Sequence, residues 1–130
     1  MCIRDSNSTA PITNPQQLRG AVIAVVRGTT SELWADRMGA KPLVTDSLKE
    51  AIDLMQQKRA EGVIYDRPAL RYFIAQNPQS DLQLAPFDLA SQTYGFAVRS
   101  GSSLRKPINV TVMSMHRVGE IRDIVDSALP

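Results

Sequence analysis

The sequence has 130 residues, of which 43% are hydrophobic and 22% charged, as in an ordinary globular domain. This composition excludes collagen-like, disordered and disulfide-scaffold proteins. The 15 basic and 13 acidic residues leave a net charge of +2, which gives no reason to expect nucleic acid or an acidic membrane surface as a partner.

The remaining global features exclude further classes. One cysteine and one histidine are too few for a zinc site built from those residues, and we expect neither a metal nor another cofactor. No apolar run approaches the about 18 residues that a membrane-spanning helix needs. Residues 1–6 do not have the pattern of a signal peptide and suggest no structural role. We therefore treat residues 1–11 as a non-native scar or linker, outside the fold.

The order of the expected elements indicates the fold class. Residues 21–26 form a continuous apolar run that is typical of a strand buried on both faces, as in a parallel sheet. Further strands are expected at 42–45, 62–65, 82–84 and 94–98. Helices are expected to begin near Thr29, Ser47, Pro68, Ser103 and Gly119, the last at a glycine that interrupts the helical pattern. The alternation predicts an α/β domain whose mostly parallel sheet is flanked by helices.

The first candidate site follows the first buried strand, at Gly28, Thr29 and Thr30. The unpaired backbone N–H groups of a helix's first turn attract a carboxylate or phosphate, and two hydroxyls add donors. The spacing of Thr29 and Glu32 also fits a capping box, in which Thr29 does no more than cap the helix. The Glu32 charge would moreover compete with an anionic guest for the same N–H groups. Both interpretations of Thr29 stay open.

The second candidate is Asp66, at the carboxyl end of the expected strand 62–65. A carboxylate there could hold an ammonium group, or could simply cap the helix that begins near Pro68. Donors at one strand end and a carboxylate at another would together complement a zwitterion. Asp88 lies in a loop with no helix or partner that defines a role for it. No residue pattern selects a catalytic group.

Five segments, in order, resemble lobe 2 of the type II periplasmic solute-binding proteins (extracellular solute-binding protein family 3). The ligand-binding domains of ionotropic glutamate receptors share that fold. The segments are Leu18 to Thr30, Asp46 to Ala51, Arg59 to Asp66, Tyr94 to Val98 and Gly101 to Asn109. Lys58 departs from the family pattern, because it stands where glycine is usual, and Gly62 stands where alanine is usual.

The resemblance implies a division of the chain and a role for the candidate residues. Residues 12–100 would be lobe 2, residues 101–130 would be C-terminal helices that pack towards lobe 1, and lobe 1 itself is missing from the sequence. Gly28, Thr29 and Thr30 would contact the carboxylate or side chain of an amino-acid ligand. Asp66 would bind its α-ammonium group. The candidate residues would then carry half of a binding site.

The expected function is therefore binding of an amino acid, not catalysis, in a periplasmic or otherwise extracytoplasmic domain. The partner that completes it would be a membrane transporter or the pore of a ligand-gated channel. The polar stretch 7–14, where a transport protein usually has a hydrophobic hinge strand, leans towards the channel. Two alternatives stay open: a dehydratase-type enzyme or regulatory module on the same scaffold, and an interaction domain that has no ligand.

Overall fold

The computed structural model describes residues 2–5 and 12–129. The chain divides into two compact units, Met1–Ser91 and Gln92–Pro130. The sequence analysis divided the chain after residue 100, between an expected lobe 2 and expected C-terminal helices.

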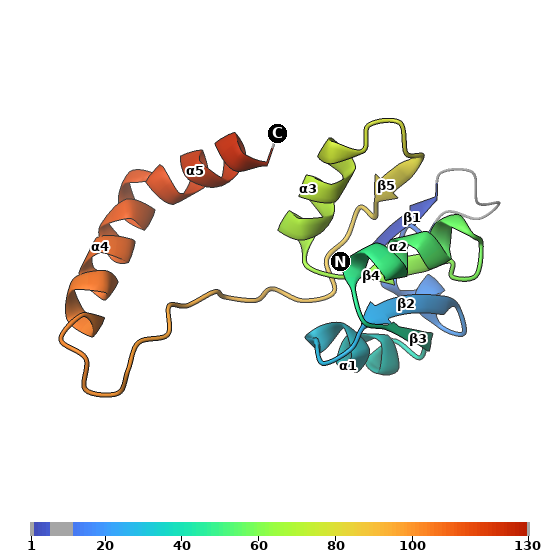
Figure 1. Ribbon diagram of the computed structural model, residues 1–130, viewed down its shortest axis with the longest axis horizontal. Coiled ribbons are helices and arrows are strands. Elements are labelled where there is room, and N and C mark those ends of the chain that lie inside the picture. Colours follow the sequence, from blue (N-terminus) through green and yellow to red (C-terminus); the bar gives the residue numbers. More distant parts are fainter. Residues whose placement is uncertain (1, 6–11, 130) are drawn as a thin grey trace. The chain divides into compact units, whose positions relative to one another are not determined.

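The first unit alternates strands and helices, as expected (Figure 1). Its strands are β1 (Cys2–Asp5), β2 (Val22–Val26), β3 (Lys41–Thr45), β4 (Gly62–Ile64) and β5 (Leu82–Leu84). Its helices are the short 3₁₀ helix η1 (Pro15–Leu18), α1 (Thr30–Arg37), α2 (Leu48–Gln56) and α3 (Arg67–Gln76). Four of the five predicted strands and the first three predicted helices are confirmed.

These strands form one five-stranded sheet in the order β3-β2-β4-β1-β5. β2 lies between β3 and β4 and is parallel to both. β1 runs antiparallel to β4 on one side and to β5 on the other, so β2, β3, β4 and β5 all point the same way. The prediction of a mostly parallel sheet is confirmed.

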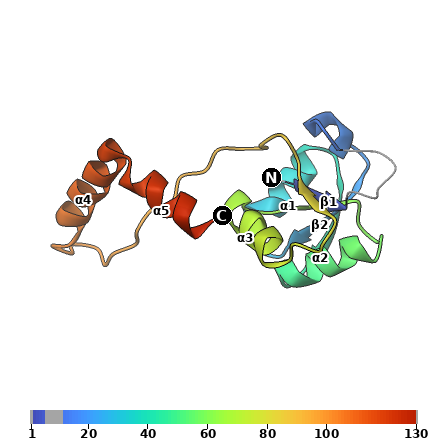
Figure 2. The same ribbon diagram turned by 90° about the horizontal axis from the view of Figure 1, so that it is seen from above.

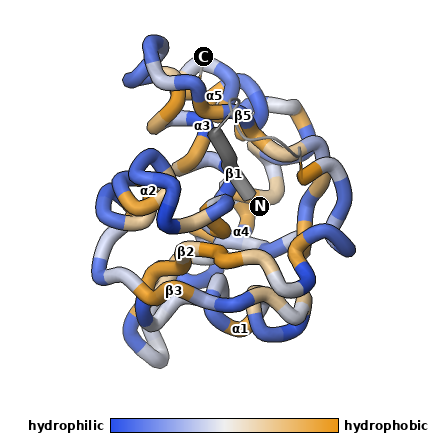
Figure 3. Tube along the Cα trace, turned by 90° about the vertical axis from the view of Figure 1, so that its right-hand side faces the viewer, coloured by the Kyte–Doolittle hydropathy of each residue, from blue (hydrophilic) through white to orange (hydrophobic). Residues whose placement is uncertain are grey.

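Two hydrophobic clusters cover the two faces of this sheet. Ala24 of β2 packs with residues of α2 and α3, whereas Ile23 and Val25 pack with α1 and η1 on the opposite face. Figure 2 shows α1 and α2 on opposite sides of the strands. In Figure 3, β2 has the colour of hydrophobic residues. Successive side chains of a strand point to opposite faces, so a strand covered on both sides needs apolar residues throughout. This explains the uninterrupted apolar run of β2.

Residues at the start of the chain have a place in the sheet that the sequence analysis did not expect. Cys2–Asp5 form β1, in which Cys2 pairs with Ile64 and Ile3 pairs with Leu84. We had set residues 1–11 aside as a scar or linker; residues 1 and 6–11 lie outside the described part. β1 supplies the backbone donors and acceptors that pair with the facing edges of β4 and β5.

The second unit contains α4 (Arg105–Val118) and α5 (Glu120–Ala128). Gly119 ends α4 with a left-handed φ of 84°, which confirms the predicted break. The predicted strand at 94–98 is wrong: this segment is extended, but no described strand pairs with it. A β-strand requires a neighbour for its backbone hydrogen bonds, and a favourable side-chain pattern cannot supply one.

The C-terminal end of α2 shows how the chain accommodates Lys58 at the position where the family pattern usually has glycine. Lys58 has a left-handed φ of 59°. Its backbone N–H donates to the carbonyl of Met55 at 2.9 Å, and the N–H of Arg59 donates to the carbonyl of Leu54 at 2.9 Å. This is the Schellman arrangement, whose left-handed position is usually a glycine because a Cβ atom is unfavourable there. The turn is thus preserved with a lysine in the glycine position.

We predict that Lys58→Gly raises the free energy of unfolding by about 0.5–1 kcal/mol, because it relieves the left-handed lysine. Urea denaturation measures the change. The matched control is Lys49→Gly at the second residue of α2, which should lower the free energy of unfolding by about 1 kcal/mol through lost helix propensity and the lost ion pair with Asp53. A loss of stability in both variants would contradict the described turn.

Candidate functional site

The candidate residues lie at one edge of the sheet. β2 and β4 are parallel neighbours, with Ala24 opposite Val63. Gly28 to Thr30 follow the end of β2, and Asp66 follows the end of β4. Since both strands point the same way, their carboxyl ends emerge at the same edge, which is where open α/β sheets bind ligands. The structure brings the two predicted halves of the site to neighbouring strand ends.

The turn from β2 to α1 is closed by Glu32. Gly28 has a φ of 72°, which favours glycine. Its backbone N–H donates to Oε1 of Glu32 at 2.7 Å. A carboxylate of the chain itself therefore occupies this donor, as the sequence analysis anticipated from the charge of Glu32. An incoming carboxylate has to replace Glu32 in order to reach the Gly28 N–H group.

Thr29 is the N-cap residue of α1. Its Oγ1 accepts a hydrogen bond from the N–H of Ser31 at 3.3 Å and donates to the carbonyl of Val26 at 2.7 Å. A hydroxyl has one proton to donate, and that of Thr29 is used. The capping interpretation therefore describes Thr29 in this structure. Thr30, the first residue of α1, is exposed at the same turn.

Asp66 occupies the N-cap position of α3, but its side chain makes no capping hydrogen bond. The residue is exposed. Ser47, at the corresponding position of α2, does cap its helix, because its side chain accepts from the N–H of Glu50 at 3.2 Å. Asp66 thus stands at an N-cap position, but its carboxylate accepts no hydrogen bond from the first turn of α3 and is exposed to solvent.

Two arginines flank the candidate residues in sequence, and each is bound to an aspartate. Arg27 precedes Gly28 and donates from Nε to Asp46 at 2.9 Å. The hydrogen bond and the charge of Asp46 raise the pKa of the Arg27 guanidinium. Arg67 follows Asp66 and binds Oδ1 of Asp88, with Nε and Nη2 each at 2.8 Å. The sequence analysis missed both pairs, because their members are 19 and 21 residues apart.

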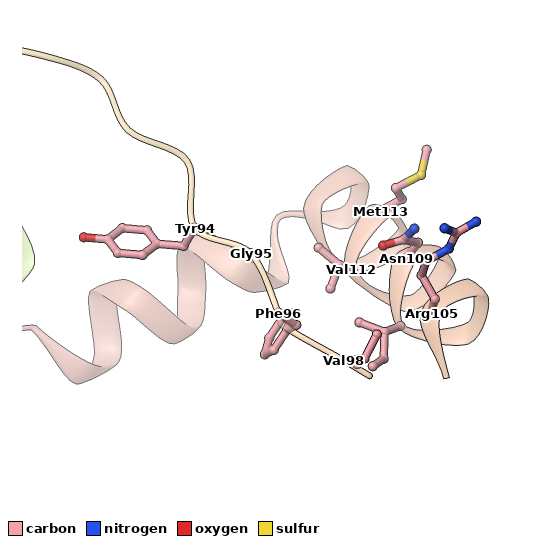
Figure 4. A pocket seen from close by; sticks show the side chains of 9 residues that line it. Tyr94, Gly95, Phe96, Val98, Arg105, Asn109, Val112 and Met113 are labelled. Atoms are coloured by element: carbon pink, nitrogen blue, oxygen red, sulfur yellow. The ribbon is translucent and has the colours of Figure 1, made fainter. Parts of the chain in front are cut away.

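The second unit has a separate pocket of about 300 Å³. It lies between the extended segment around Phe96 and Val98 and the side of α4 that carries Ile108 and Val112 (Figure 4). Its lining is mostly apolar, with Arg105 and Asn109 at one end in that view. No described residue of α4 or α5 is buried, and several large hydrophobic side chains are exposed, among them Val110 and Met113.

The described residues contain no cluster of three or more metal-ligating side chains. Within the same residues, no helix has both the length and the apolar character needed to cross a membrane.

Comparison with known proteins gives one curated relative and many solved structures. No family model matches the chain. A probable amino-acid ABC transporter-binding protein from Haemophilus influenzae is 32% identical over 92 residues. The alignment covers 69% of this chain and 35% of the relative, so the match spans about a third of that protein.

Among solved structures, the GluR0 ligand-binding core in complex with L-glutamate has a TM-score of 0.91 and 32% identity, over 99% of this chain and 58% of that one. The P235GK mutant of the arginine-binding protein from T. maritima has a TM-score of 0.77 and 27% identity, over 98% and 56%. Domain 2 of that protein, solved alone, has a TM-score of 0.58 and 27% identity, over 65% of this chain and 90% of the domain.

These similarities confirm the predicted resemblance and the predicted fold. The relatives are binding proteins by name. The chain covers somewhat more than half of the GluR0 core and of the P235GK mutant. The chain accordingly has the α/β fold of one lobe of a type II periplasmic-binding-protein domain, as found in amino-acid-binding proteins of ABC transporters and in the GluR0 ligand-binding core.

Proposed function

We propose that this chain is lobe 2 of an extracytoplasmic domain that binds an amino acid in a cleft and catalyses no reaction. The observation that carries the proposal is the TM-score of 0.91 with the GluR0 ligand-binding core, which was solved with L-glutamate. Since the chain spans 58% of that core, lobe 1 of the same cleft would come from a segment outside this sequence.

The β2–α1 turn would receive the carboxylate of the ligand. Its backbone N–H groups and the positive end of the α1 dipole favour an anion. The Gly28 N–H already holds the Glu32 carboxylate at 2.7 Å, which supports the suitability of this donor for a carboxylate. Because the Thr29 proton is used within the turn, the ligand carboxylate would depend on backbone donors such as the Gly28 N–H, once Glu32 releases it.

Asp66 would bind the α-ammonium group. Its exposed carboxylate is not used as a helix cap, so a ligand can bind without breaking a capping hydrogen bond. A charge-assisted hydrogen bond between an ammonium and a carboxylate contributes about 1.5–3 kcal/mol. The two halves of a zwitterion would thus be held by neighbouring strand ends.

Of the two settings for such a domain, the receptor of a ligand-gated channel is favoured over the soluble component of a transporter. The TM-score is 0.91 with the GluR0 core and 0.77 with the arginine-binding protein. In either setting the ligand would shift the two lobes towards a closed arrangement, and this closure would be the signal.

The helices α4 and α5 would pack against lobe 1. Their apolar side chains are exposed in the described chain, and exposed apolar surface of this extent calls for a partner. The extended segment 94–98 would there find the strand that it lacks here.

We predict that Asp66→Asn weakens amino-acid binding by the complete gene product about 10- to 100-fold, because the ammonium loses its charged acceptor. Isothermal titration with L-glutamate, L-glutamine and L-arginine measures the affinity. Asparagine keeps the capping capacity of the position, so the free energy of unfolding should stay within about 0.5 kcal/mol.

The matched control for this experiment is Asp53→Asn, which removes a carboxylate of α2 that pairs with Lys49 at 2.8 Å. It should leave the affinity unchanged. Equal affinity of Asp66→Asn and the unmodified protein would refute the role of Asp66. Failure of the unmodified protein to bind any amino acid would refute the proposed function as a whole.

A further prediction concerns the helix surface. Met113 is 73% exposed in the described chain. Met113→Asp should therefore change the free energy of unfolding of this 130-residue chain by less than about 0.5 kcal/mol. In the complete gene product, where lobe 1 would cover α4, the same change should cost about 3 kcal/mol, because it buries a charge.

Ser114→Asp, at a neighbouring exposed position of α4, is the control and should be tolerated in both proteins. Urea denaturation provides the free energies. Equal effects of Met113→Asp in the chain and in the complete gene product would argue against packing of α4 on lobe 1.

A further inference from the structure

The feature that points beyond the proposed contacts is the cation next to Asp66. Arg67 is the first residue of α3 and is partly buried. Both its Nε and its Nη2 lie 2.8 Å from the same oxygen, Oδ1 of Asp88. Asp88 belongs to the loop after β5, 21 residues away. The guanidinium is therefore held by a carboxylate of a different segment, although the Asp66 carboxylate is adjacent in sequence.

An arginine in this position can weaken the binding of an ammonium group to Asp66 in two ways. Its guanidinium can pair with the neighbouring Asp66 and occupy the acceptor that the ligand needs. If it stays unpaired, its charge repels a second cation that approaches Asp66, since Coulomb repulsion acts over several ångströms. A counter-ion on Arg67 removes both effects at once.

The other side of the candidate site has the same arrangement. Arg27 directly precedes Gly28 and is held by Asp46 of the loop after β3. Thus each arginine that flanks the candidate residues is neutralised by an aspartate from another loop, while the Asp66 side chain makes no capping hydrogen bond.

We propose that Asp88 is a positioning residue of the ammonium subsite, which binds and neutralises Arg67 so that Asp66 stays available to the ligand. The proposal rests on the proposed function, because it requires that Asp66 bind an ammonium group. Asp88 itself does not touch the ligand. It acts on ligand binding by neutralising the positive charge of Arg67 next to Asp66.

A purely structural role for the pair is the competing explanation, in which Arg67 and Asp88 only anchor the loop after β5 to α3. The two explanations differ in how the single changes combine. If the pair is an anchor, losing either partner has the same effect as losing both. If Asp88 neutralises Arg67, only the loss of Asp88 is harmful, and removal of Arg67 as well repairs it.

The experiment titrates the complete gene product with whichever of L-glutamate, L-glutamine and L-arginine the unmodified protein binds. The variants are Asp88→Asn, Arg67→Gln and the double variant. Because 40% of the Arg67 side chain and 57% of the Asp88 side chain are accessible to solvent, we expect a modest effect. Asp88→Asn should weaken binding about three- to fivefold. Arg67→Gln should retain or improve the affinity, and the double variant should return to within about twofold of the unmodified protein.

Ionic strength gives a second readout that an anchor would not move. The loss caused by Asp88→Asn should shrink at high salt, because salt screens the exposed guanidinium. Asp88→Glu should restore the affinity, since it keeps the counter-ion.

Equal weakening in both single variants and the double variant would overturn the proposal in favour of an anchor. Unchanged affinity in Asp88→Asn would also overturn it. Both results leave the proposed function intact as long as the unmodified protein binds and Asp66→Asn binds more weakly. Absence of binding by the unmodified protein would instead remove the proposed function, and this inference with it.

Discussion

The burial of β2 on both faces is the constraint on which the rest of the lobe depends. β2 takes its hydrogen bonds from β3 and β4 in parallel ladders, and its side chains supply both hydrophobic clusters. A parallel strand cannot return directly to its neighbour, so each connection has to cross a face of the sheet as a helix. The turns that begin those helices therefore gather at the carboxyl edge. The candidate site is a consequence of this geometry, whatever ligand uses it.

The chemistry of that edge is set by how each polar group is paired. Glu32 and Thr29 use backbone groups of the β2–α1 turn, and the arginines at the two strand ends use aspartates from other loops. Asp66 differs, because its position calls for a helix cap and its side chain makes none. An N-cap residue ordinarily accepts a hydrogen bond from the first turn of its helix. Where such a residue makes no capping contact in a unit whose other described helices are capped by a side chain, a functional role is expected.

The sequence was sufficient for features that depend on local pattern. The strand at 21–26, the helix start near Ser47 and the break at Gly119 were all predicted and are confirmed. Prediction failed where the outcome depends on a distant partner. The segment 94–98 has the pattern of a strand but no described strand beside it, and Cys2–Asp5 have no such pattern but lie between β4 and β5. The pairing of Arg67 with Asp88 was missed for the same reason, since no periodicity relates residues in separate loops.

The exposure of the candidate residues bears on how the proposed site would bind a ligand. Gly28, Thr30 and Asp66 are all exposed, so any ligand there exchanges hydrogen bonds with water for hydrogen bonds with the protein at little net gain. The same contacts become stronger when a facing surface excludes water, because the local dielectric constant falls. Such a surface would also strengthen repulsion from an unpaired arginine. A site that closes in this way would therefore need its flanking cations neutralised, and Arg27 and Arg67 are both paired with aspartates.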